Sequence, residues 1–71
     1  RRRAGRIARV RTALSTRYGR YGLERIAMAE GAANATKSIE EAVLARPDLS
    51  VSRLAAVLGQ RIEEALANRD V

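Results

Sequence analysis

Several residue types are missing from this chain. It has no cysteine and no histidine, which excludes disulfide bonds and metal sites built on Cys or His ligands. Phenylalanine and tryptophan are also absent, and there is a single methionine. Any core is therefore expected to consist of leucine, isoleucine, valine and alanine side chains and the one methionine. No apolar run approaches the roughly 20 residues that a transmembrane helix needs, which excludes a membrane-spanning segment.

The usual combinations of catalytic residues are missing as well. The sequence has no nucleophile–base pair built on Cys or His, no phosphate-binding loop and no glycine-rich dinucleotide motif. Four of the eight acidic residues form two adjacent pairs, Glu40 with Glu41 and Glu63 with Glu64. Adjacent residues of a helix point about 100° apart, so neither pair converges on one point. We therefore predict no enzymatic activity, no catalytic residue, no metal and no cofactor.

The charge of the chain is concentrated at its N-terminal end. Residues 1–22 contain eight arginines and no acidic residue, a net charge of +8, whereas residues 23–71 carry a net charge of −2; together they give the +6 of the chain. Such an asymmetry is typical of a basic segment that binds an anionic partner. We therefore divide the chain into an arginine-rich arm, residues 1–22, and a helical domain, residues 23–71.

The arm is the first candidate site. Its guanidinium groups can neutralise phosphates, which gives salt-dependent binding that does not read the base sequence. Two tyrosines lie among the arginines and are able to stack on bases. The predicted nucleic-acid-binding residues are Arg1, Arg2, Arg3, Arg6, Arg9, Arg11, Arg17, Tyr18, Arg20 and Tyr21. An acidic protein is the alternative partner. A membrane surface is disfavoured, because the apolar face of the arm is narrow and has no Trp or Phe.

The apolar pattern predicts an all-α fold of three to four short helices. Residues 1–5 are expected to be flexible and to precede an amphipathic helix, which the glycines of the Tyr18–Gly22 segment should end. Pro47 ends the segment before it, and Ser50 is a good N-cap for a last helix that runs to Asn68. The short linker around Pro47 predicts a helical hairpin in the C-terminal part.

The central segment, residues 23–46, has two interpretations that the sequence leaves open. As one helix, it would carry a continuous but thin apolar stripe. As two helices, the first would end near Glu30 and turn through Gly31, and the second would begin with a capping box of Ser38 and Glu41.

Apolar residues at three- and four-residue spacing define the predicted core and subunit interface. They are Leu23, Ile26, Ile39, Val43, Val51, Leu54, Leu58, Ile62 and Leu66. A chain of 71 residues buries a modest fraction of its surface and, without disulfides or a metal, often relies on a second subunit. We therefore expect a homo-oligomer.

Residues 26–36 resemble the common core of the helix-turn-helix family. The matching residues are Ile26, Ala27, Gly31, Ala32 and Thr36. In that family an alanine packs between the helices, a glycine opens the turn, and a Ser or Thr follows in the recognition helix. The resemblance implies that Asn34, Lys37 and Ser38 begin a helix that faces the major groove. Two positions depart from the pattern, since Ala33 stands where a capping serine is usual and Lys37 where an apolar residue is usual.

These patterns predict a small nucleic-acid-binding, most simply DNA-binding, helical protein that acts as an oligomer. It would be a regulator or a packaging component of the cytoplasm or the nucleoid. The alternative is a helical interaction module, such as an adaptor, an antitoxin-like inhibitor or a subunit of a larger complex. A sealed homodimer with a free basic arm would favour nucleic acid, whereas a monomer with an exposed apolar stripe would favour a protein partner.

Overall fold

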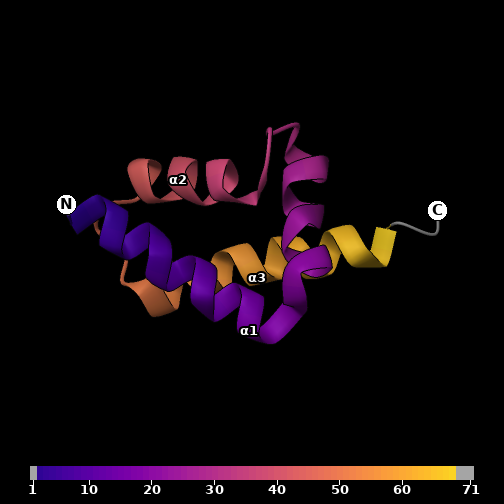
Figure 1. Ribbon diagram of the computed structural model, residues 1–71, viewed down its shortest axis with the longest axis horizontal. Coiled ribbons are helices and arrows are strands. Elements are labelled where there is room, and N and C mark those ends of the chain that lie inside the picture. The colour runs from indigo at the N-terminus through magenta and orange to yellow at the C-terminus, as the bar shows by residue number, and fades with distance from the viewer. Residues whose placement is uncertain (1, 69–71) are drawn as a thin grey trace.

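The computed structural model describes residues 2–68 and contains, within them, three helices and no strand (Figure 1). The helices are α1 (Arg2–Glu30), α2 (Ala35–Ala45) and α3 (Val51–Asn68). The prediction of an all-α fold is confirmed. The molecule is elongated, with extents of 39, 21 and 18 Å. None of the described helices is both long enough and apolar enough to cross a membrane.

A sharp kink divides α1 into two helical parts. Gly19 has φ 73° and ψ 174°, a conformation that glycine adopts without strain and other residues avoid. Figure 1 shows the chain turning steeply within α1 and then continuing as a helix. The predicted interruption by glycine is present, but it redirects the helix instead of opening a loop. The expected flexibility of residues 1–5 is wrong for residues 2–5, which begin α1; Arg1 lies outside the described residues.

The central segment forms two helices. Gly31 adopts φ 71° directly after α1. Asn34 then caps α2, because its Oδ1 accepts a hydrogen bond from the backbone N–H of Lys37 at 3.0 Å. The predicted capping box of Ser38 and Glu41 is wrong, since Ser38 is buried inside α2. Asparagine caps a helix as well as serine does, and here it starts the helix four residues earlier.

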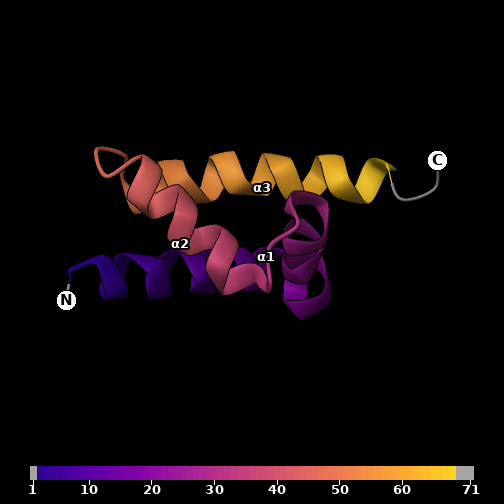
Figure 2. The ribbon, with the colours of Figure 1, turned by 90° about the horizontal axis from the view of Figure 1, so that it is seen from above.

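The loop between α2 and α3 follows the prediction more closely. Pro47 stands just after the end of α2, where it cannot continue a helix. Ser50 Oγ accepts a hydrogen bond from the backbone N–H of Arg53 at 3.2 Å, so Ser50 is the N-cap of α3 as expected. Although the short loop joins them, α2 and α3 each pack chiefly on α1 and make few contacts with each other. Seen from above, α2 runs obliquely across α3 and the first part of α1 (Figure 2), and it lies on one side of both (Figure 1).

One apolar core fills the space between the three helices. Its buried members are Val10, Leu14, Leu23, Ile26, Ala35, Ile39, Val43, Leu54, Leu58 and Ile62. Among the predicted core residues, Val51 and Leu66 are only partly buried at its edge. The apolar stripes thus close the core of a single chain. Because Val10 and Leu14 belong to this core, the basic segment is packed against the rest of the protein.

Candidate nucleic-acid interface

The first part of α1, residues 2–18, carries most of the predicted site. One face of this helix packs on α2 and α3 through Ile7, Val10 and Leu14. Helical geometry therefore puts Arg6, Arg11 and Arg17 on the flanks and Arg9 closer to the outer side. Arg3 lies in line with Ile7 and Val10 but is exposed at the start of the helix. The opposite, solvent-facing side is made of small residues, all of them exposed: Gly5, Ala8, Thr12 and Thr16. A ligand can approach the helix backbone closely on this side.

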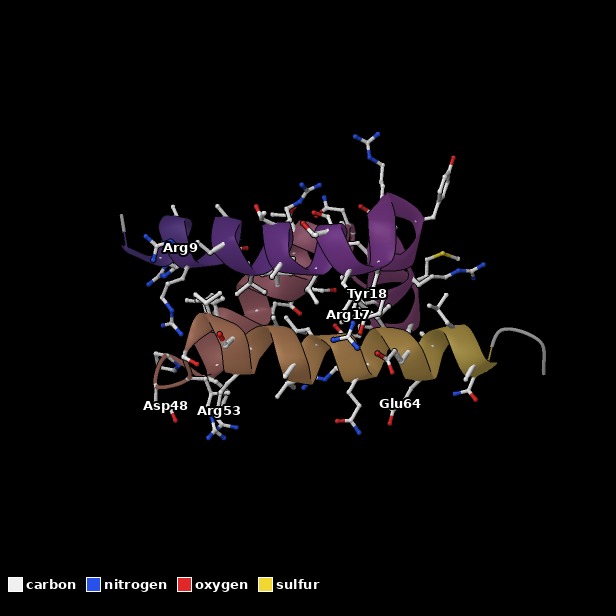
Figure 3. All side chains as sticks on the ribbon, turned by 90° about the horizontal axis from the view of Figure 1, so that it is seen from below. Arg9, Arg17, Tyr18, Asp48, Arg53 and Glu64 are labelled. Atoms are coloured by element: carbon white, nitrogen blue, oxygen red, sulfur yellow. The ribbon has the colours of Figure 1, made fainter. Side chains whose placement is uncertain are left out.

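Three arginines of the predicted site are free to bind a ligand. Arg3, Arg9 and Arg20 are exposed, and within residues 2–68 no side-chain hydrogen bond or ion pair holds them. Arg1 and the side chain of Arg2 lie outside the described part of the chain. Figure 3 shows Arg9 near the end of the molecule where Arg53 of α3 also lies. Positive charge from two helices is thus present at this end.

Two further arginines are anchored by neutral oxygen atoms. Arg6 is half-buried, and its guanidinium donates to the carbonyl oxygen of Pro47 at 2.8 Å and to that of Leu49. Arg11 donates from Nε to Oγ1 of Thr36 on α2 at 3.2 Å. Neither contact involves a carboxylate. The fold therefore orders both side chains without cancelling their charge.

Arg17 and Tyr18 point towards α3 (Figure 3). The Tyr18 hydroxyl donates to Oε2 of Glu63 at 2.6 Å, and a guanidinium nitrogen of Arg17 lies 3.6 Å from the same oxygen. The Arg17 guanidinium also lies 5.4 Å from the centre of the Tyr18 ring, within the range of a cation–π contact. The hydrogen bond to Glu63, followed by burial, raises the pKa of Tyr18, although the Arg17 charge acts in the opposite direction.

The ring of Tyr18 is used to dock α1 on α3. It lies over Gly59, where an added Cβ would be 2.9 Å from the hydroxyl oxygen and 3.4 Å from the nearest ring carbon. The ring of Tyr18 is thus held against α3 by the protein itself, and its role in stacking on bases stays a prediction. Tyr21 is different, because 91% of its surface is exposed.

Most arginines of the candidate interface keep an uncompensated charge. Of the six between residues 3 and 20, only Arg17 forms an ion pair within the described part of the chain. That pair is exposed on both sides, where ion pairs contribute little. Figure 3 shows another acid of α3, Glu64, pointing away from α1. The first part of α1 is therefore a positively charged surface.

The predicted recognition helix does not present the expected residues. Gly31 has the positive φ, and Ala27 the burial, that the helix-turn-helix resemblance implies. However, Ser38 is 2% exposed and faces the interior, and the side chain of Asn34 is occupied as the helix cap. Lys37 is exposed, but its Nζ lies 3.3 Å from Oε1 of Glu40. The assignment of Ser38 to a DNA-reading surface is wrong, because α2 turns this residue towards the core.

Glutamates weaken the case for α2 further. Glu40 and Glu41 both lie near Lys37 on the outer side of this short helix. A helix that enters the major groove passes between two phosphate backbones, and these carboxylates would be repelled there. The basic helix α1 is therefore the stronger candidate for contact with nucleic acid.

A second exposed cluster next to the kink was missed by the sequence reasoning. Met28 is 72% exposed and lines a shallow hollow together with Tyr21, Arg25 and Leu66. The kink at Gly19 interrupts the regular 100° rotation per residue. The apolar stripe of the first part of α1 therefore cannot be extended along the sequence to predict whether Met28 is buried. An exposed aromatic ring beside a guanidinium is able to stack on a base.

Neither a metal nor a known relative directs the assignment of function. Among residues 2–68, no group of three or more His, Cys, Asp or Glu side chains is arranged to hold a metal ion. Comparison with family models, with curated proteins and with solved structures gives no match to this chain. The function must therefore be argued from the charge and geometry of the site.

Proposed function

We propose that the protein binds nucleic acid through the exposed arginines of α1, and that its contacts are mainly to phosphates. The uncompensated charge of the arginines carries the proposal: Arg3 and Arg9 are free, and Arg6 is bonded only to carbonyl oxygens. Such an array of charges binds a phosphate backbone favourably, because each phosphate that is neutralised releases condensed counterions.

The dimensions of α1 support a duplex as the ligand. Residues 2–18 form a helix of about 25 Å, and this length spans about seven base pairs. The small residues on the outer side allow the backbone of the helix to come close to the nucleic acid. Arg6 and Arg11 are already ordered by the fold, so they lose little conformational entropy on binding.

In this proposal the protein does not discriminate strongly between base sequences. Phosphate contacts position a protein on DNA but carry no sequence information, and α2 does not present a basic recognition surface. A packaging or coating role therefore fits the site better than that of a sequence-specific regulator. Such a role suits an oligomer, since several copies of α1 would then contact one nucleic-acid molecule.

The test is fluorescence anisotropy with a short random duplex at about 50 and about 200 mM salt. One variant replaces the three free arginines by glutamine: Arg3→Gln, Arg9→Gln and Arg20→Gln. The matched control replaces three basic residues that lie outside α1 and are each paired with a carboxylate: Lys37→Gln, Arg46→Gln and Arg61→Gln. Both variants lose the same net charge, so only the position of the change differs.

The expected result is a change in salt dependence for the first variant alone. Loss of three phosphate contacts should reduce the slope of log K against log salt by about 2.7. Equal losses in both variants would show attraction by net charge only, and absence of binding at the lower salt would refute the proposal. Polyglutamate serves as a competitor. If it displaces the protein from the labelled duplex as effectively as unlabelled DNA does, the result would point to an acidic protein as the partner.

A further inference from the structure

The hollow next to the kink of α1 is a surface that the arginines of the first helical part do not use. Tyr21, Arg25 and Met28 line it from the second part of α1, and Leu66 lines it from α3. Its volume is about 430 Å³, within the range of sites that take small organic groups. Figure 2 shows the second part of α1 beside the C-terminal part of α3, the two elements that form the hollow.

The helical period puts the side chains of this hollow on the outer side of α1. Residues 21, 25 and 28 are four and three positions apart, so they share one face of the helix. Leu23 and Ile26 lie on the opposite face and are buried in the core. Tyr21 is 91% exposed and Met28 is 72% exposed, the two highest values among the large apolar side chains of the described residues. Two such side chains around one hollow indicate a contact surface.

The charges around the hollow favour an anionic ligand. Arg25 is half-buried, and no carboxylate of the described residues forms an ion pair with it. Glu24 also lines the hollow, but its Oε1 accepts a hydrogen bond from the backbone N–H of Ala35 at 3.2 Å, at the start of α2. Arg20 is exposed and immediately precedes Tyr21. One uncompensated guanidinium therefore lines the hollow, and another stands next to the ring in the sequence.

We propose that this hollow holds an unpaired nucleobase, with the ring of Tyr21 as the stacking surface and Arg25 beside it for the adjoining phosphate. An aromatic ring together with nearby guanidinium groups is the usual equipment of a site for single-stranded nucleic acid. Inside a duplex each base is covered by its neighbours, so the side of a duplex offers no base face to the ring. A single-stranded segment presents such faces freely.

The inferred substrate is therefore a nucleic acid with a single-stranded segment next to a duplex. This inference rests on the proposed function, because the arginines of the first part of α1 would hold the duplex by its phosphates. The hollow lies directly after that part of the helix, on the far side of the kink at Gly19. A strand that leaves the duplex at the kink is then in a position to place a base on Tyr21.

The first test compares two DNA probes by fluorescence anisotropy: a duplex with a single-stranded thymidine overhang, and the same duplex with an overhang of abasic sites. Both probes carry the same phosphates, so a difference in affinity reports on the bases. The wild type should bind the thymidine overhang about ten-fold more tightly. Tyr21→Leu should abolish this preference, whereas Tyr21→Phe, the matched control, should keep it because the ring remains. Tyr21 is exposed, so both variants should fold.

A blunt duplex separates a failure of this site from a failure of the proposed function. Tyr21→Leu should bind it as tightly as the wild type does. If the wild type binds both overhangs equally, or if Tyr21→Leu keeps the preference, the site is overturned while phosphate binding stands. Binding of the thymidine overhang without any binding of the blunt duplex would support the site at Tyr21 and refute the contact of α1 with a duplex.

Tyrosine emission gives a direct readout of the stacked ring. The chain has two tyrosines and no tryptophan, so in Tyr18→Phe the emission comes from Tyr21 alone. Single-stranded oligothymidine should quench this emission, because the ring stacks on a base. An abasic oligonucleotide of the same length should leave it unchanged. Unquenched emission in the presence of saturating oligothymidine would overturn the proposal.

Discussion

Replacement of Gly59 by alanine should be harmful only while the hydroxyl of Tyr18 is present. Gly59 lies inside α3 and is buried. Alanine in a helix interior is more favourable than glycine by about 1 kcal/mol. However, the new Cβ would lie 2.9 Å from the Tyr18 hydroxyl oxygen, so the ring must move. The displacement strains or breaks the 2.6 Å hydrogen bond to Glu63.

The sizes of these opposing effects decide whether Gly59→Ala raises or lowers the free energy of unfolding. The hydrogen bond contributes about 1 kcal/mol because Glu63 is exposed, and an off-rotamer tyrosine costs about 1 kcal/mol more. Together these losses exceed the gain in helix propensity, so Gly59→Ala should destabilise the wild type by about 1 kcal/mol. In Tyr18→Phe the oxygen is gone, and the nearest remaining atoms are ring carbons at 3.4 and 3.5 Å. There the same change should stabilise the protein by up to about 1 kcal/mol.

The assay is urea unfolding of the four proteins of this double-mutant cycle, followed by far-UV circular dichroism. For a small domain, 1 kcal/mol corresponds to a shift of about 1 M in the urea midpoint. The coupling free energy between residues 18 and 59 should be about 1–2 kcal/mol. If Gly59→Ala stabilises both backgrounds equally, the Tyr18 hydroxyl does not lie over α3 at this point.

Three further predictions concern contacts that hold the helices. Arg6→Ala should lower the free energy of unfolding by about 2 kcal/mol through loss of two charge-assisted hydrogen bonds, and Arg6→Lys should recover only part of it; full recovery would show that charge alone matters. Asn34→Ala should cost about 1 kcal/mol as a lost helix cap, whereas Ser38→Ala should cost nothing, because the Ser38 hydroxyl has no hydrogen-bond partner; the reverse order of costs would reassign the cap. Because the pKa of Tyr18 is raised in the folded chain, its stabilising contribution should be complete below about pH 10, the value for an unperturbed tyrosine, and be lost as the pH rises further. The difference in urea midpoint between the wild type and Tyr18→Phe should therefore shrink only above that pH, and a difference that grows there would contradict the hydrogen bond.

Local patterns in the sequence predicted much of the fold. The apolar stripe of α3 and the cap at Ser50 were correct, because helical periodicity and capping depend only on neighbouring residues. The start of α2 was placed wrongly because Asn34 and Ser38 are both good caps. Which of the two caps the helix depends on the side of α2 that packs on α1, and this is decided by tertiary packing. Ser38 precedes Ile39, and both are buried.

The candidate site was predictable as a charged surface but not in its details. The arginines were evident from the composition, and the period of an α-helix predicted how they are distributed around it. The acceptors of Arg6 lie 41 and 43 residues away, and the partner of Tyr18 lies 45 residues away. Rules based on residue spacing apply only to neighbours in the sequence, so they cannot predict contacts of this kind. The division of the arginines into free and anchored ones therefore required the folded chain.

The packing around Tyr18 has a consequence for how this sequence can change over evolutionary time. A Cβ at Gly22 would lie 2.9 Å from Cβ of Tyr18, and one at Gly59 equally close to its hydroxyl oxygen. One large side chain thus depends on two small ones from different helices. In an alignment of relatives, positions 18 and 59 should covary, with a larger residue at 59 accompanied by a smaller one at 18. Position 22 should stay glycine, because every residue other than glycine at position 18 carries the Cβ that a side chain at 22 would meet. A lineage that loses the tyrosine is then free to replace Gly59, but not Gly22, by a stronger helix former.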